Sequence, residues 1–149
     1  MYVRLTTDVA PYPSPRTRVL AECARRGQDA VVTGCAALLT GGAVDVPLIT
    51  VLGGPGAAWA LGDPDVHGHW FRVWAARGLL WAYGDAAGPA VVAGLRDEQW
   101  RVREMCAKVV AQHLIGDAFA AVLPLRDDPV PRVRAAADRA VARLTAAGM

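Results

Sequence analysis

A seven-residue pattern occurs twice in the second half of this 149-residue chain and constrains its fold more than any other feature. Asp97–Arg103 and Asp128–Arg134 both read Asp-x-x-x-Arg-Val-Arg, and they are displaced by 31 positions (128 minus 97). Each copy stands where turn residues give way to an apolar pattern of helical spacing. Self-similarity at this period is typical of chains built from stacked pairs of helices.

A fainter third copy precedes these two. It aligns Arg72 with Arg101 at a shift of 29 positions (101 minus 72). This register places Arg72, Arg101 and Arg132 at equivalent positions on three successive helices, and Trp74 where the last arginine of the motif stands. Helices packed side by side would then carry a column of arginines about 10 Å apart. Such a column fits phosphate contacts, or solvated faces and ion pairs between repeats.

Capping and turn signals divide the chain into helices of ordinary length. Ser14 followed by Pro15 is typical of an N-cap and the first helical position, and the prolines before it prevent an earlier regular helix. Asp29 is expected to cap the second helix, and glycine-rich turns around 53–56 and 62–65 interrupt the order. The expected helices cover about residues 15–26, 30–39, 45–52, 66–83, 86–95, 99–115, 118–125 and 131–146.

The motif Asp-x-x-x-x-Val-Arg at a helix start, followed by an alanine-rich stretch, resembles the HEAT repeat family. Residues 70–146 carry the resemblance, whereas 15–69 share only helix length and spacing. It implies an all-α fold, a short right-handed alpha-solenoid of about four HEAT-like helical pairs with the second helices on the concave face. We therefore expect an irregular N-terminal arm at 1–14 and a HEAT-like repeat domain at 15–149, with an insertion at about 53–66.

The composition fits one domain that needs neither disulfides nor a structural metal. Hydrophobic residues make up 54% of the chain, charged residues 20%, and the formal net charge is +2. No apolar run reaches the roughly 18–20 residues of a membrane span, and the N-terminus lacks the pattern of a secretory signal. The three cysteines are far apart, which indicates reduced thiols. We expect a cytoplasmic protein without membrane association.

The expected helix at 66–83 is unusual because both of its faces are apolar. One face is the expected core stripe, formed by Val73, Ala76, Leu79, Leu80 and Tyr83. The opposite face carries His67, Trp70, Trp74, Arg77 and Trp81. This tryptophan face is either core, covered by the preceding repeat and the insertion with Trp59 or by the segment around Tyr12, or it lines a groove for a ligand.

No pattern in the sequence predicts a catalytic residue, a metal or a cofactor. His67 and His69 near Asp63 and Asp65 do not match the spacing of an established metal site. His113 continues the apolar face of its helix, which indicates a partly buried histidine with a satisfied hydrogen bond. No phosphate-binding glycine loop is present. The sequence leans away from an enzyme.

The resemblance favours a binding or scaffold module that recognises a protein or peptide partner on its concave face, although fold alone does not fix a role. The candidate binding residues are His67, Trp70, Trp74, Arg77, Trp81, Arg72, Arg101 and Arg132. Two alternatives stay open. A tryptophan-lined pocket would suit a small aromatic or cationic ligand, with or without catalysis, as in HEAT-like bilin lyases. A basic face with tryptophans is similar to that of HEAT-like alkylpurine DNA glycosylases, although interleaved acidic residues count against nucleic acid.

Overall fold

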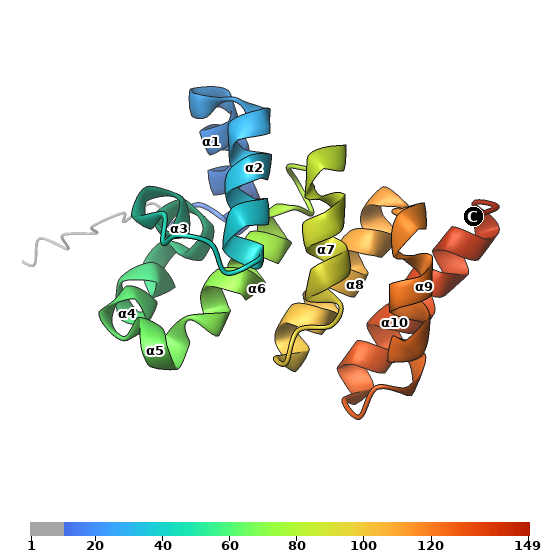
Figure 1. The fold of residues 1–149 in the computed structure, drawn as a ribbon. Coiled ribbons are helices and arrows are strands. Elements are labelled where there is room, and N and C mark those ends of the chain that lie inside the picture. Colours follow the sequence, from blue (N-terminus) through green and yellow to red (C-terminus); the bar gives the residue numbers. More distant parts are fainter. Residues whose placement is uncertain (1–10) are drawn as a thin grey trace, which may run out of the picture.

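The computed structural model describes residues 11–149, and throughout this range the chain forms helices and turns without a β-strand (Figure 1). This confirms the all-α class. The α-helices are α1 (Pro15–Arg26), α2 (Gln28–Leu39), α3 (Val46–Gly53), α4 (Ala57–Gly62), α5 (Pro64–His67), α6 (His69–Gly78), α7 (Gly88–Gly94), α8 (Trp100–His113), α9 (Phe119–Val122) and α10 (Pro131–Ala146). Short 3-10 segments are η1 (Gly54–Gly56), η2 (Asp85–Ala87), η3 (Gly116–Ala118) and η4 (Leu123–Asp127). Of the expected arm, 1–10 lie outside the described residues, and 11–14 are exposed and not helical.

Local capping explains where several helices begin. The Ser14 hydroxyl accepts a hydrogen bond from the Thr17 amide at 3.1 Å, as the sequence predicts. The Asp45 carboxylate accepts one from the Leu48 amide at 3.0 Å and starts α3. The prediction that Asp29 caps α2 is wrong, because α2 already begins at Gln28 and Asp29 lies inside its first turn. An acidic residue there still complements the positive end of the helix dipole.

The expected long helix at 66–83 is the largest difference between prediction and structure. It divides at Gly68 into α5 and α6, and α6 ends at Gly78, after which residues 79–82 form a turn and a bend. Gly78 has a packing role, because a Cβ there would lie 2.7 Å from Cδ2 of Leu52. Within the insertion, α4 forms a helix of six residues, which is less than two turns.

Six of the α-helices in the described residues pack in two layers. One layer holds α6, α8 and α10 in that order, with α8 in contact with both of its neighbours. The other layer holds α2, α7 and α9; α2 packs on α6, α7 on α8, and α9 on α10. Figure 1 shows α7 and α9 in front of α8 and α10. We call the first of these the α6–α8–α10 layer.

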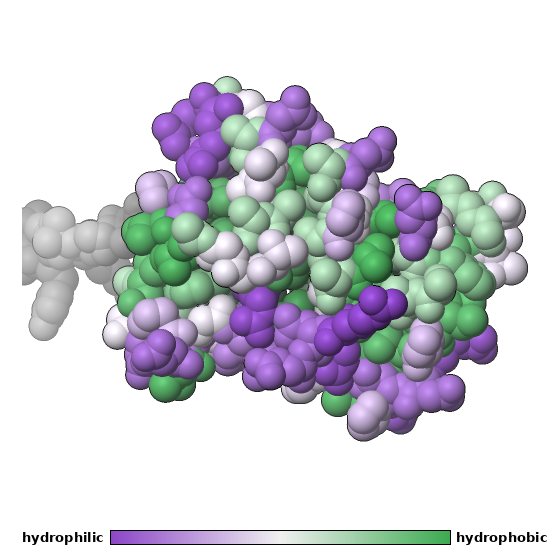
Figure 2. Space-filling model, viewed as in Figure 1, coloured by the Kyte–Doolittle hydropathy of each residue, from purple (hydrophilic) through white to green (hydrophobic). Residues whose placement is uncertain are grey.

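The surface on the side away from the α6–α8–α10 layer is mixed in character. Figure 2 shows hydrophobic and hydrophilic residues interspersed over the face that carries α2, α7 and α9. None of the helices between residues 11 and 149 combines the length and apolar character that a bilayer crossing needs. The fully buried side chains include Val102, Val109 and Leu144.

Candidate binding face

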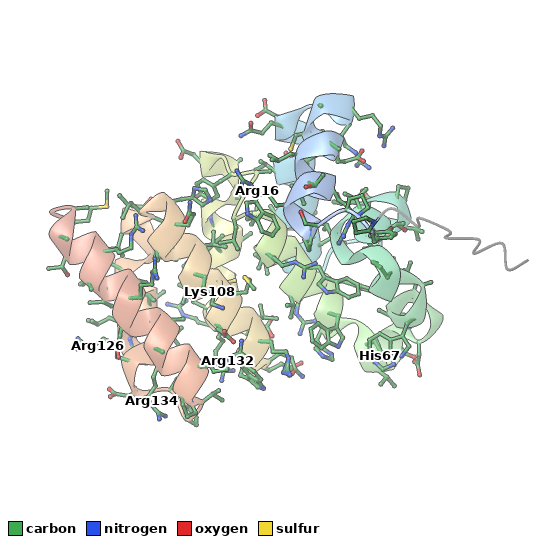
Figure 3. All side chains as sticks on the ribbon, turned by 180° about the vertical axis from the view of Figure 1, so that it is seen from behind. Arg16, His67, Lys108, Arg126, Arg132 and Arg134 are labelled. Atoms are coloured by element: carbon green, nitrogen blue, oxygen red, sulfur yellow. The ribbon has the colours of Figure 1, made fainter. Side chains whose placement is uncertain are left out.

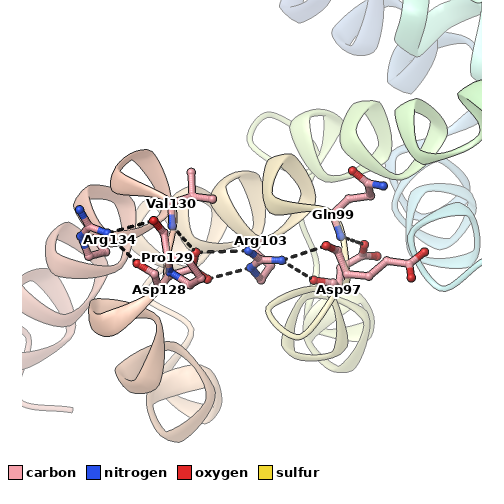
Figure 4. Close-up of polar contacts among 8 residues, drawn as sticks. Asp97, Gln99, Arg103, Asp128, Pro129, Val130 and Arg134 are labelled. Atoms are coloured by element: carbon pink, nitrogen blue, oxygen red, sulfur yellow. Dashed lines mark hydrogen bonds and ion pairs between the residues drawn. The ribbon is translucent and has the colours of Figure 1, made fainter.

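Two forked ion pairs connect consecutive helices of the α6–α8–α10 layer. Arg72 on α6 donates from Nε and Nη2 to the two carboxylate oxygens of Asp97, at 2.8 and 3.2 Å. Arg103 on α8 does the same to Asp128, at 2.9 and 3.2 Å (Figure 4). Bidentate arginine–carboxylate pairs are directional as well as strong. We call this series the Arg–Asp ladder.

The ladder also fixes the loops that precede α8 and α10. One oxygen of Asp97 accepts the Gln99 amide at 2.9 Å, and one oxygen of Asp128 accepts the Val130 amide at 2.9 Å. Nη1 of Arg103 donates to the backbone carbonyls of Asp97 and Glu98 at 2.9 and 3.1 Å. Arg134 makes the corresponding bonds to the two carbonyls before α10, as Figure 4 shows. The motif therefore holds each loop and ties it to the preceding helix.

Asp128 carries the clearest electrostatic signature of the ladder. Burial raises the pKa of its carboxyl group, but the hydrogen bonds from Arg103 and Val130 and the charges of Arg103 and Arg134 outweigh that effect, so the pKa lies below its ordinary value. Asp128 therefore stays ionised in the folded protein at neutral pH. It acts as a fixed negative charge inside the structure.

The ladder corrects the register predicted for the third repeat. Arg72 pairs with Asp97 in the same way as Arg103 pairs with Asp128. Arg72, Arg103 and Arg134 are therefore the equivalent residues. The shift of 29 that placed Arg72 in a column with Arg101 and Arg132 is wrong by two positions. The prediction that Trp74 replaces the motif arginine is wrong for the same reason. The dipeptide Arg72-Val73 matches Arg101-Val102 in residue type but not in position, because the buried equivalent of Val102 is Phe71.

In the corrected register, Trp70 is the equivalent of Arg101 and Arg132, and these side chains meet across the layer. The guanidinium carbon of Arg101 lies 5.3 Å from the ring centroid of Trp70 and 4.3 Å from that of Trp100. The guanidinium carbon of Arg132 lies 5.4 Å from the Trp100 centroid. All three distances are within the range of cation–π attraction. Aromatic and cationic groups thus alternate from α6 through α8 to α10, and we call Trp70, Arg101, Trp100 and Arg132 the Trp–Arg row.

A buried glutamate organises the cations beside this row. Oε1 of Glu104 accepts from Nη2 of Arg132 at 3.0 Å and lies 2.9 Å from Nζ of Lys108, while the side chain itself is only 7% exposed. Figure 3 shows Lys108 and Arg132 on this side of the molecule, on α8 and α10 respectively. Because both cations share one carboxylate oxygen, the positive charge around Glu104 is incompletely neutralised.

A groove of about 520 Å³ continues from this cluster between α8 and α10. Four cationic side chains line it, and Glu104 is the one carboxylate in its lining. The cations are Lys108, Arg132, Arg139 and Arg143. Leu80, Ala111 and Ala136 contribute apolar surface to the same groove. The groove therefore combines an apolar lining with excess positive charge.

Trp74 lies in the core. Its side chain is 8% exposed, and it packs on the glycine-rich end of α3, where a Cβ at Gly53 would lie 2.5 Å from the ring. The ring centroid of Trp70 is 6.2 Å away, but Trp70 remains only partly buried. The insertion therefore covers Trp74, which is the structural alternative that the sequence left open for this residue.

Arg77 is bound to the protein backbone. Its Nη2 donates to the Leu52 carbonyl at 2.7 Å, and Nε of Arg18 donates to the Val51 carbonyl at 2.7 Å. Burial, with the nearby charge of Arg18, lowers the pKa of Arg77. Both arginines complement the negative end of the α3 dipole, so Arg77 has a structural partner on α3.

The remaining members of the predicted tryptophan face lie in separate surroundings. The ring of His67 packs against that of the exposed Trp59 of the insertion, with ring centroids 3.8 Å apart and the planes tilted by 31°. Trp81 follows α6 and packs, half-buried, against the core. Of the predicted tryptophans, Trp70 is the one that lies against a predicted arginine, Arg101. Trp100 is not among the residues that the sequence predicted for the binding face. Its position next to Arg101 within the motif is the signal that could have identified it.

A second cavity, of about 680 Å³, lies where α7 meets the end of α8. His113 is hydrogen-bonded there as predicted, with Nε2 at 2.7 Å from the Leu79 carbonyl, and its ring stacks on Tyr83 at 4.4 Å. Burial and the charges of Asp85 and Asp117 raise the pKa of Tyr83. This cavity carries negative charge, in contrast to the α8–α10 groove.

Residues 11–149 contain no group of three or more His, Cys, Asp or Glu side chains placed to hold a metal ion. Burial raises the pKa of the Cys35 thiol to about 12 and also raises that of Cys106. Both groups are thus protonated at neutral pH, and a thiol is a poor nucleophile. No family model matches the chain, and no curated protein or solved structure shows significant similarity to it.

Proposed function

We propose that this chain is a HEAT-like helical-repeat module that binds an acidic segment of a protein partner on its α6–α8–α10 layer. The observation that carries the proposal is the Trp–Arg row, in which Trp70, Arg101, Trp100 and Arg132 alternate across three helices. Tryptophan and arginine are the residue types most enriched at the energetic centres of protein interfaces. Guanidinium groups also match the geometry of carboxylates.

The proposed architecture is a short right-handed solenoid of HEAT-like pairs. Its repeats would be α7 with α8, α9 with α10, and α2 with α6, the last pair being separated in sequence by the insertion. The Arg–Asp ladder supports this proposal, because equivalent residues make equivalent contacts between successive repeats. A scaffold held in this way would keep the Trp–Arg row in a fixed geometry, which lowers the entropic cost of binding.

Charge distribution favours a protein partner over duplex DNA. The chain has a formal net charge of only +2, whereas duplex-binding domains are generally strongly basic. The cations of the groove adjoin apolar side chains, which a phosphate backbone would not use. Binding to nucleic acid is therefore the competing outcome in the test below.

The test compares two charge-reversed variants as bait in a nuclease-treated lysate of the source cells, followed by cross-linking and identification of the captured proteins. R101E/R132E alters the Trp–Arg row. R16E/R96E makes the same change in net charge at two exposed arginines of α1 and the α7–α8 turn. We expect one protein to be captured by the wild type and by R16E/R96E but not by R101E/R132E.

Two results would overturn the proposal. Equal capture by R101E/R132E and the wild type would show that the row does not contact the partner. Capture that occurs in an untreated lysate but not in the nuclease-treated one, together with binding of the purified protein to a DNA duplex that R101E/R132E abolishes, would assign the face to nucleic acid.

A further inference from the structure

Two side-chain stripes face each other across the α8–α10 groove. On α10 the groove is lined by Arg132, Ala136, Arg139 and Arg143, and on α8 by Glu104, Lys108 and Ala111. Spacings of three and four residues keep each stripe on one face of its helix. From Arg132 to Arg143 the α10 stripe rises roughly 16 Å, which is the length of about three helical turns.

The two arginines at the far end of the groove have no carboxylate partner in the part of the chain that the structure describes. Within residues 11–149, Arg132 and Lys108 share Glu104, but Arg139 and Arg143 form no ion pair. They stand one helical turn apart on α10, where like charges repel each other. A ligand that brings carboxylates to this point would relieve the repulsion and form charge-assisted hydrogen bonds.

The apolar part of the groove defines the rest of the ligand. Ala111 and Ala136 are buried, so the small side chains of both helices leave depth between α8 and α10, and Leu80 adds apolar surface. A purely ionic ligand would gain nothing from this surface, whereas apolar side chains would be removed from water on it. The groove therefore suits a ligand with one apolar and one acidic side.

We propose that the α8–α10 groove binds an acidic amphipathic helix of the partner, with apolar side chains against Leu80, Ala111 and Ala136 and with carboxylates on Arg139 and Arg143. This inference rests on the proposed function and deepens it, because it names the structure and charge of the bound segment. Laying the apolar face of a helix in a groove is a common mode of peptide recognition. The groove is close to the Trp–Arg row, since Arg132 belongs to both.

The probe is a fluorescein-labelled helical peptide of about 14 residues, roughly 21 Å long, with leucine and alanine on one face and glutamates flanking it at helical spacing. A second peptide has the same residues shuffled, so that the charges and apolar groups are spread around the helix. A labelled single-stranded oligothymidine serves as the phosphate probe. Fluorescence anisotropy at low salt measures binding of each to the wild-type protein.

Three variants locate the site. R139E/R143E reverses the two cations at the far end of the groove, and R16E/R96E makes the same change in net charge elsewhere. Ala135→Trp fills the groove from an exposed position of α10 without changing charge, so it blocks the site without disturbing the core. Circular dichroism verifies that each variant retains its helices.

We expect the amphipathic peptide to bind the wild type more tightly than either other probe. R139E/R143E should weaken it at least about tenfold, Ala135→Trp several-fold, and R16E/R96E by no more than about twofold. Equal binding of the shuffled peptide or of the oligothymidine would overturn the inference, as would full binding by R139E/R143E and Ala135→Trp.

The results with these variants also distinguish a failure of this inference from a failure of the proposed function. If R101E/R132E weakens the peptide while R139E/R143E and Ala135→Trp do not, then the Trp–Arg row binds the acidic segment and the groove assignment alone fails. If the wild type binds neither acidic peptide, the groove assignment fails, and capture of a partner that depends on Arg101 and Arg132 decides the proposed function by itself.

Discussion

Helix α6 is held on its two sides by different chemistry. Toward α8 it uses Arg72, whose ion pair with Asp97 is repeated between Arg103 and Asp128. Toward α3 it uses Trp74, which packs on Gly53, and Arg77, which binds the Leu52 carbonyl. The C-terminal side is built from a contact that repeats, whereas the N-terminal side is built from contacts made once.

This difference teaches how each side is encoded. A repeated contact needs the same residue types at the same spacing, so the C-terminal repeats are visible as self-similarity in the sequence. A contact made once leaves no such trace, and an indole ring packed on a glycine gains its stability from apolar burial and close fit. The two sides should therefore respond differently to mutation, pH and charge.

The largest effect is expected at Trp74. Trp74→Ala should lower the free energy of unfolding by about 3–5 kcal/mol, because it removes a buried indole and leaves a cavity beside Gly53. Met105 stands at the equivalent position of the next repeat and is only partly buried. Met105→Ala should cost about 1 kcal/mol. Urea unfolding followed by circular dichroism gives both values, and equal losses would remove the contrast between the two sides.

A smaller but still large effect is expected in the ladder. Asp128→Asn keeps an acceptor for the Val130 amide but removes the charge that pairs with Arg103, and should cost about 1.5–3 kcal/mol. Asp138→Asn is the matched control, because Asp138 is exposed and pairs with the exposed Arg126. That change should cost less than about 0.5 kcal/mol. Chemical denaturation at neutral pH compares the two variants, and a similar cost for both would contradict the role given to the ladder.

Acid should weaken both sides through one carboxylate on each. Hydrogen bonds from Arg25 and Arg26 lower the pKa of Glu22 on the N-terminal side, as those from Arg103 and Val130 lower that of Asp128. A lowered folded-state pKa contributes stability that is present above the unfolded-state value of about 4 and is lost as pH falls through the folded-state value. The free energy of unfolding should therefore fall below about pH 5.

Two variants test whether these two carboxylates cause the pH dependence of stability. Asp128→Asn and Glu22→Gln should each show a shallower decline of stability between neutral pH and about pH 3 than the wild type, measured as urea midpoints across the range. An unchanged slope in Asp128→Asn would mean that Asp128 has the same pKa in the folded and unfolded states.

The smallest effect on stability is expected at the groove. R139E/R143E should change the free energy of unfolding by less than about 0.5 kcal/mol, because both arginines are exposed and form no ion pair within residues 11–149. Thermal unfolding followed by circular dichroism measures the change. A loss of more than 1.4 kcal/mol, about tenfold in the folding equilibrium, would assign these arginines a structural role instead.

The sequence predicted the C-terminal side well because its determinants are local. The expected helix at 131–146 agrees with α10, and 99–115 contains α8. The turn before each helix and its apolar periodicity lie within a few residues of one another, and α10 also has a proline at its start. No distant contact is needed to place these helices.

The N-terminal side was harder to predict because its determinants are distant. The burial of Trp74 depends on its contact with Gly53, which is 21 positions earlier in the chain. Helical periodicity alone cannot tell which face of a helix another segment covers. The register of the third repeat depended on recognising that Phe71 takes the place of Val102. The Trp–Arg row could be predicted only in part, since Arg101 and Arg132 were candidates whereas Trp100 needs the packed structure.

The most direct test of the binding face is a nuclear magnetic resonance titration of the isotopically labelled protein with the acidic amphipathic peptide. We expect the largest shifts at the arginine Nε–H groups of Arg132, Arg139 and Arg143, which line the α8–α10 groove, and smaller shifts at the indole of Trp100, with little change on α2, α7 and α9. Shifts concentrated on α7 and α9, or at Asp85 and Asp117 of the second cavity, would show that the α6–α8–α10 layer is not the binding face.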